Sequence, residues 1–162
     1  MENLYSEELY NELKKEKNKI LIISSIIFGV AIILVGLTWF IIKPSNYLLI
    51  KILASIFLSI IACGFFYCLL EIVLPRNHYA KFVYHLLTTN RYKDSFYIIS
   101  IGRRTIVEKD IYCYELEAID SNKSKIYLCI EEQFLSKIKE DEKIEMIISQ
   151  NIVIALEDKK NG

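Results

Sequence analysis

Two long runs of apolar residues dominate the first half of the chain. The first covers Ile20–Ile42 without a charged side chain, and the second covers about Leu48–Leu70 with Lys51 as its one cation. A helix rises about 1.5 Å per residue, so each run can cross a hydrocarbon core of about 30 Å. Both runs are apolar all round, whereas the helices of a soluble bundle, which are the alternative, usually carry a polar stripe. The pattern predicts a transmembrane hairpin over residues 20–74, with spans at about 20–42 and 48–70.

The ends of the two spans predict how the hairpin lies in the membrane. The linker Lys43-Pro44-Ser45-Asn46 is long enough only for a turn, and Trp39 and Tyr47 suit the interface beside it. Basic residues near the other ends of the spans outnumber Lys43 and Lys51 of the linker side; they are Lys14, Lys15, Lys17, Lys19, Arg76 and Lys81. The positive-inside rule therefore places both termini in the cytoplasm and the spans in the inner (plasma) membrane.

Small residues recur along one face of each span and predict a helix-packing seam. The seam residues are Ser25, Gly29 and Gly36 in the first span and Ser55, Ser59 and Cys63 in the second. Small side chains let helix backbones approach closely in lipid. Two interpretations stay open at this point, namely packing within the hairpin and packing between copies in a homo-oligomer.

Two shorter segments outside the spans have helical periodicity. Residues 1–19 are predicted to contain a cytoplasmic helix with a thin apolar stripe at Tyr5, Leu9 and Leu13. It is either a solvated extension of the first span or a docking helix for a partner. Residues 76–93 form an amphipathic connecting helix, which covers the following domain or lies on the membrane surface.

From Ser95 the apolar period changes from that of a helix to two, which is typical of half-buried strands. If the apolar side chains of the first hairpin face each other, Leu116 pairs with Leu128 and Ala118 pairs with Ile126, around a turn at 121–123. A second hairpin opposes Ile144, Met146 and Ile148 to Ile152, Ile154 and Leu156 around a turn at 149–151. Residues 131–138 suggest a short helix between the hairpins, and Gly102 suggests a bulge or bend in the strand-like segment 96–107.

These elements predict the fold class of the whole chain. A two-helix transmembrane hairpin is followed by the connecting helix and by a small antiparallel β-domain at residues 94–158, with a tail at 159–162. About five strongly curved strands in so short a segment favour a barrel, because closure removes exposed sheet edges.

A resemblance to known proteins rests on three segments of the β-domain. They are the strands at 112–120 and 126–130 and the turn Lys139-Glu140-Asp141-Glu142 before Ile144. A membrane hairpin followed by such a domain resembles the NfeD-like proteins and uncharacterised bacterial two-span families with an OB-like or SH3-like tail. The resemblance covers the last 60 residues or so and the topology. Where such tails often carry a Gly-Asp pair, this chain has Glu140-Asp141. The resemblance implies partner binding and supplies no catalytic residue.

Charge and composition exclude several function classes. The 20 basic and 20 acidic residues cancel, so the chain lacks the basic surplus of a nucleic-acid binder. A phosphate-binding loop needs several glycines, and the segment after residue 75 has only Gly102 and Gly162. His78 and His85 stand two helical turns apart, too far to share a metal ion. We therefore predict no metal, no cofactor and no enzymatic activity.

The cysteines and arginines add two further expectations. Cys113 and Cys129 are predicted to be diagonal neighbours on the exposed face of the first hairpin, in a geometry poor for a disulfide. Arg103 and Arg104 beside Gly102 form the best candidate for an anion-binding site, although an exposed strand edge explains them as well.

Two hypotheses for function follow. The first is a non-enzymatic membrane protein whose cytoplasmic β-domain binds a protein partner, as an assembly subunit or an immunity-type protein. The second is a ligand-gated membrane effector, in which the β-domain binds a small anion or nucleotide and the hairpins oligomerise into a pore. In both cases the expected surroundings are membrane lipid and either a protein partner or further copies of the chain.

Overall fold

The structure, a computed structural model, describes residues 1–41, 48–108 and 111–157. The chain divides into a β-unit, made of Met1–Asn11 with His78–Gly162, and a helical unit, Glu12–Asn77. The divisions, at residues 11–12 and 77–78, both fall inside helices. The reason is that the N-terminal residues and the connecting helix pack with the strands.

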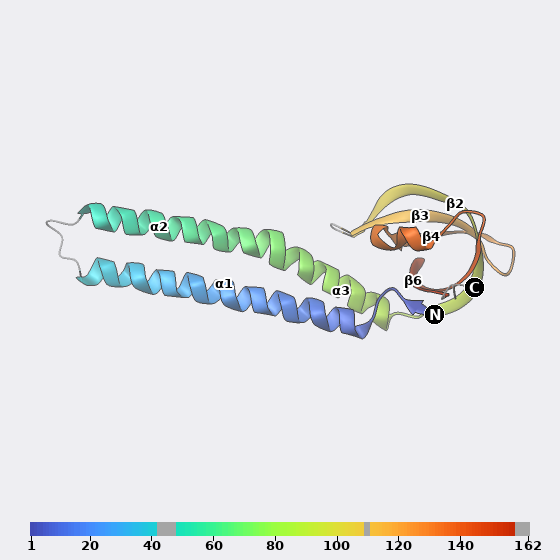
Figure 1. Ribbon diagram of the computed structural model, residues 1–162, viewed down its shortest axis with the longest axis horizontal. Coiled ribbons are helices and arrows are strands. Elements are labelled where there is room, and N and C mark those ends of the chain that lie inside the picture. The colour runs from blue at the N-terminus through green and yellow to red at the C-terminus, as the bar shows by residue number, and fades with distance from the viewer. Residues whose placement is uncertain (42–47, 109–110, 158–162) are drawn as a thin grey trace. The chain divides into compact units, whose positions relative to one another are not determined.

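The helical unit consists of two long helices that run side by side (Figure 1). Helix α1 spans Glu7–Ile41 and α2 spans Leu48–Tyr67. Both are long and apolar enough to cross a membrane, and only 6% of each apolar window is buried. So little burial means that these helices are not the core of a soluble fold within this chain. The predicted turn at residues 43–46 and Tyr47 lie outside the described residues.

The second helix continues into the β-unit through a change of helix type. A π-helical turn, η1, covers Cys68–Val73, and α3 follows at Leu74–Thr88. Pro75 has no N–H to donate to the carbonyl of Glu71, so the regular hydrogen-bond ladder cannot pass this point. Accordingly, the Leu74 N–H donates to the carbonyl of Leu69, five residues back, as in a π-bulge. Helix α3 ends at Thr88, five residues before the predicted end of the connecting helix.

The first residues of the chain form a strand where the apolar stripe predicted a helix. Strand β1, Glu2–Asn3, pairs antiparallel with β6, and Leu4 and Tyr5 are buried with 5% and 3% of their surface exposed. Helix α1 begins only at Glu7, where the Ser6 hydroxyl accepts a hydrogen bond from the Leu9 N–H at 3.1 Å. The predicted helical stripe was wrong at Tyr5, because this side chain belongs to the β-unit.

Six strands, one more than predicted, form the sheet of the β-unit. The strands after β1 are β2 (Tyr92–Glu108), β3 (Ile111–Ile119), β4 (Lys125–Glu131), β5 (Lys143–Ser149) and β6 (Ile152–Leu156). The 3-10 helix η2, Glu132–Lys137, lies between β4 and β5, as Figure 1 shows, where a short helix was predicted. The sheet order is β1-β6-β4-β3-β2-β5, with a further β5–β6 pairing. All pairings are antiparallel except β4–β6, which is parallel at Cys129 and Ile152.

The register of the first hairpin is confirmed. Leu116 lies opposite Leu128 and Ala118 lies opposite Ile126, as the alternation of apolar residues predicted. These four side chains lie on the inner face of β3 and β4, and Leu116, Ala118 and Leu128 are fully buried. A slip of one residue would have exchanged these for the flanking glutamates.

The second hairpin has a shorter turn than predicted. Gln150 and Asn151 both have positive φ, 49° and 66°, which is the pattern of a two-residue type I′ turn. Ser149 therefore pairs with Ile152. Further along, a register shift places Met146 opposite Leu156, where the alternation had predicted Ile154.

Candidate functional site

The residues around Gly102 shape the outer half of β2. Ile101 lies opposite Leu116 but Arg104 lies opposite Tyr114, so β2 holds one extra residue there, as a β-bulge does. A Cβ built on Gly102 would lie 3.1 Å from the backbone oxygen of Glu115. The bend predicted at this glycine is confirmed, and its cause is the close approach of the β3 backbone.

Replacing Gly102 with valine is expected to lower the free energy of unfolding of the β-unit by about 1–3 kcal/mol. The branched side chain meets a backbone oxygen that cannot turn away, so the bulge must open or the strands must separate. Amide hydrogen exchange of β3 in the full-length protein measures the effect. The control is Thr105→Val, which adds a valine to an exposed position of the same strand. Equal protection in both variants would contradict this role of Gly102.

The two arginines beside the bulge have different surroundings. The Arg104 guanidinium donates to Glu132 Oε2 at 2.7 Å and lies 3.9 Å from the ring centroid of Tyr112. An incoming anion would therefore compete with a carboxylate that already occupies this guanidinium. Arg103 is exposed, and the described residues show no ion pair for it. Arg104 therefore has a partner within the β-unit, and Arg103 lies beside it in an exposed part of β2.

Beyond the bulge, β2 carries an exposed apolar surface. Ile106 is 62% exposed, and Val107 and Tyr112 are each more than a third exposed. Among the described residues, the part of β2 after Ser100 pairs with β3 alone, because the pairing with β5 is confined to Tyr92–Tyr97. We call Arg104, Ile106 and Tyr112 the outer β2–β3 surface, because Ile106 lies opposite Tyr112 in the register and the Arg104 guanidinium lies over the Tyr112 ring. Apolar side chains beside an unpaired strand edge are typical of a surface that binds another chain.

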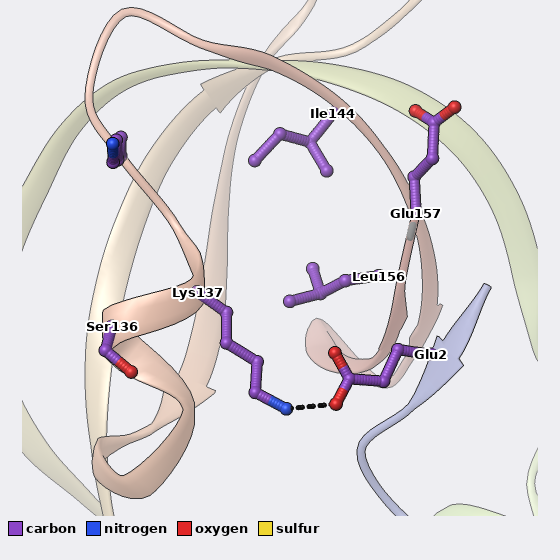
Figure 2. A pocket seen from close by; sticks show the side chains of 7 residues that line it. Glu2, Ser136, Lys137, Ile144, Leu156 and Glu157 are labelled. Atoms are coloured by element: carbon purple, nitrogen blue, oxygen red, sulfur yellow. Dashed lines mark hydrogen bonds and ion pairs between the residues drawn. The ribbon is translucent and has the colours of Figure 1, made fainter. Parts of the chain in front are cut away.

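A cavity of about 300 Å³ lies between η2 and the ends of β1, β5 and β6. Figure 2 shows Ser136 and Lys137 on one side, Glu2 and Glu157 on the other, and Ile144 and Leu156 between them. Lys137 forms an ion pair with Glu2, and Lys139 also lines the cavity. Ile144 and Leu156 are buried, so the cavity has an apolar floor beneath walls of opposite charge.

One carboxylate of the β-unit accepts hydrogen bonds from two phenols, of which Tyr5 is buried and Tyr79 is half-buried. Tyr5 donates its hydroxyl to Glu131 Oε2 at 2.7 Å, and Tyr79 donates to the same oxygen at 3.0 Å. Gln133 Nε2 in turn donates to the Tyr79 hydroxyl at 2.8 Å. Burial and the charge of Glu131 raise the pKa of both tyrosines, so both phenols stay protonated and able to donate. We call Tyr5, Tyr79, Glu131 and Gln133 the tyrosine cluster.

Cys113 lies beside this cluster and is fully buried, although the alternation of β3 placed it on the exposed face. Cys113 lies opposite Glu131 in the register of β3 and β4, so its side chain shares the face on which Glu131 accepts hydrogen bonds from Tyr5 and Tyr79. Burial is the main cause that raises the pKa of its own thiol, to about 12, and the nearby Cys129 and Glu131 add to it. The prediction failed here because the N-terminal segment and α3 both reach this face, and a pattern within β3 does not report that cover.

The remaining predicted positions are dispersed. Of the six seam residues, Ser55 and Gly29 are half-buried, while Ser25, Gly36, Ser59 and Cys63 are exposed. Outside its own stretch of helix backbone, a Cβ built on Gly29 or Gly36 would have no atom within 4 Å. The contact between the helices is made instead by larger groups, such as Phe28 and Phe65, whose rings stack at 4.7 Å. The seam therefore lies mainly outside the hairpin contact.

The described residues contain no group of three or more metal-ligating side chains. His85 Nε2 lies 3.1 Å from Gln150 Oε1, which links α3 to the turn between β5 and β6. The sequence analysis did not find the tyrosine cluster, because Tyr5 and Glu131 stand 126 positions apart. Comparisons of the chain with protein-family models, with curated proteins and with solved structures find no match.

Proposed function

We propose that the chain is a non-enzymatic membrane protein whose β-unit binds a protein partner at the membrane surface. Three features support this proposal. The two long helices are apolar and unburied, which suits lipid rather than water. The β-unit has its own core, centred on Phe96, Ile98 and Leu116. The outer β2–β3 surface leaves apolar side chains exposed on that otherwise well-packed unit.

The path of the chain supports the proposal that both termini lie on the same side of the membrane. Met1–Asn11 and the segment from His78 onward belong to one unit, and the two apolar helices lie between them in sequence. If both helices cross the membrane, the N-terminal residues and the strands must stay on one side of it. Together with the lysines before the first span, this favours the cytoplasmic side.

We infer further that the sheet closes into a barrel. The antiparallel pairings connect β4, β3, β2, β5 and β6 in that order, and the parallel pair between β4 and β6 returns to the start. The Cys129 N–H donates to the Asn151 carbonyl at 2.7 Å at this closing point. A five-stranded ring with a short helix between its third and fourth strands is the arrangement expected of an OB-like domain. The relationship to NfeD-like proteins remains a proposal that rests on this topology.

The observation that carries the proposed function is the exposed Ile106 beside the unpaired edge of β2. An edge with free backbone groups can accept a strand of another chain, while pockets between its side chains select the sequence. The alternative, an anion-gated effector, has less support, because the Arg104 guanidinium that would bind the anion already pairs with Glu132. We therefore favour an extended protein segment with apolar side chains as the partner of this surface.

Site-specific photocrosslinking in the native host tests this function. A photoreactive amino acid at position 106 is expected to capture a protein in intact membranes, because the partner covers this side chain. The matched control places the same group at Tyr127, which is similarly exposed but lies on β4. Capture at 106 and not at 127 supports the proposal. If a partner were captured from neither position, or equally from both, a specific interface on β2 would be refuted.

A further inference from the structure

The first residues of the chain border the cavity of the β-unit at Glu2 and reach, at Tyr5, the carboxylate that lies opposite the buried thiol of Cys113. We call Glu2–Tyr5 the N-terminal strap. Its backbone makes two residue pairs with β6, and the Leu4 N–H donates to the Ile154 carbonyl at 2.9 Å. Such a short strand contributes few backbone hydrogen bonds. Most of the free energy that keeps the strap in place must therefore come from contacts of its side chains.

Two polar contacts fasten the side chains of the strap. Tyr5 reaches the carboxylate of Glu131, and its ring makes edge contacts with Phe82 at 6.0 Å and Phe134 at 5.5 Å. Glu2 pairs with Lys137 across the cavity, as Figure 2 shows. Glu2 is about half exposed, so this second contact is weak. The hydrogen bond from Tyr5 to a charged acceptor is the stronger fastening.

We propose that the N-terminal strap is a releasable cover, held by the Tyr5–Glu131 hydrogen bond, whose departure opens the cavity beside Lys137 and exposes Cys113 while the strands stay folded. The strap is suited to this role because it leads directly into α1 through the cap residue Ser6. Tyr10, in the first turns of α1, contacts Tyr84 of α3 within the same unit, so the chain after Ser6 keeps its own contacts when the strap leaves. Tyr79, the second donor to Glu131, belongs to α3 and stays in place when the strap leaves.

The fastening can be weakened without disturbing the packing. Tyr5→Phe removes one hydroxyl and keeps the ring between Phe82 and Phe134. Loss of a hydrogen bond to a charged group is expected to raise the population of the open state about 10- to 100-fold. The matched control is Tyr79→Phe, which removes the other hydroxyl from the same oxygen of Glu131 but leaves the strap fastened.

Three readouts on the full-length protein in lipid nanodiscs follow the strap separately from the strands. Amide exchange at Leu4 reports the strap, and amide exchange at Leu116 and Leu128 reports the strands. Maleimide labelling of Cys113 reports the uncovered thiol, which otherwise reacts slowly because it is buried and its pKa is raised. Acylation of Lys137 relative to Lys139 reports the opened ion pair, since both lysines line the same cavity.

The expected result is selective. In Tyr5→Phe, exchange at Leu4 and labelling of Cys113 and Lys137 rise about 10- to 100-fold, while Leu116 and Leu128 keep their protection. Leu4→Ala, which removes buried surface from the strap alone, is expected to act in the same direction. Equal loss of protection at the strap and the strands would overturn the proposal, because the strap would then open only when the β-unit unfolds. No change in Tyr5→Phe, or the same change in Tyr79→Phe, would overturn it as well.

Discussion

Phe96→Ala is expected to lower the free energy of unfolding of the β-unit by about 3–5 kcal/mol. The ring of Phe96 is 0% exposed, and it is among the largest side chains that are fully buried in this unit. It stands in the half of β2 that pairs with β5, opposite Ile144. The substitution removes the ring and leaves a cavity that the surrounding strands cannot fill, because β2 pairs with β5 at Phe96 and with β3 from the next residue, Tyr97, onward.

Amide exchange of Leu116 and Leu128 in the full-length protein measures this loss, since the most protected amides exchange through global opening. A loss of 3–5 kcal/mol corresponds to exchange about 150- to 4,000-fold faster. Tyr127→Ala removes a ring of similar size from an exposed position and is expected to change exchange little. If Phe96→Ala behaved like this control, the assignment of Phe96 to the core would be wrong.

The alternation of side chains was sufficient to predict the register of β3 and β4. Leu116 and Ala118 can be buried opposite Leu128 and Ile126 in only one register, because a shift by one residue would bury Glu115 and Glu117. The bend at Gly102 could also be predicted, because a glycine within a strand often marks a close backbone approach. Both conclusions depend on interactions between neighbouring positions of the chain.

The N-terminal strap shows why other parts could not be predicted in this way. Tyr5, Leu9 and Leu13 have helical spacing, and only contacts with distant segments, such as that between Tyr5 and Glu131 and the pairing of β1 with β6, distinguish a strap from a helix. Cys113 lies opposite Glu131, on the face that these distant segments reach. Local periodicity reports which face of an element is apolar, and it does not report that a distant segment covers the opposite face.

The arginine site was predicted from the position of Arg103 and Arg104 beside Gly102, and the structure adds its surroundings. The two cations were a candidate anion site, with an exposed strand edge as the alternative. The bulge at Gly102 and the carboxylate of Glu132 give Arg104 an internal partner instead. A sequence pattern could not have found this pair, because Arg104 and Glu132 lie on β2 and η2, which meet only in the folded unit.

The double variant Ile26→Arg/Ile33→Arg is expected to prevent stable integration of the chain into the membrane. Both isoleucines are about 60% exposed in the structure and stand seven residues apart, on one face of α1. An arginine at the centre of a transmembrane helix costs about 2.5–3.5 kcal/mol, whereas isoleucine is favourable there. The two substitutions together therefore oppose insertion by about 6 kcal/mol, and the fraction of chain that resists alkaline extraction from membranes should fall sharply.

The direction in which the arginines change membrane integration and solubility distinguishes lipid from water as the surroundings of α1. In lipid, the outward face of the helix must be apolar, and the matched variant Ile26→Leu/Ile33→Leu is expected to integrate like the parent protein. In water, two exposed isoleucines are unfavourable, so the arginines would leave the protein folded and raise its solubility. A double arginine variant that is abundant, folded and soluble without detergent would therefore refute the membrane hairpin. The proposed position of the β-unit at a membrane surface would fail with it, while the N-terminal strap, which rests on contacts within the β-unit, would remain to be judged by its own exchange experiment.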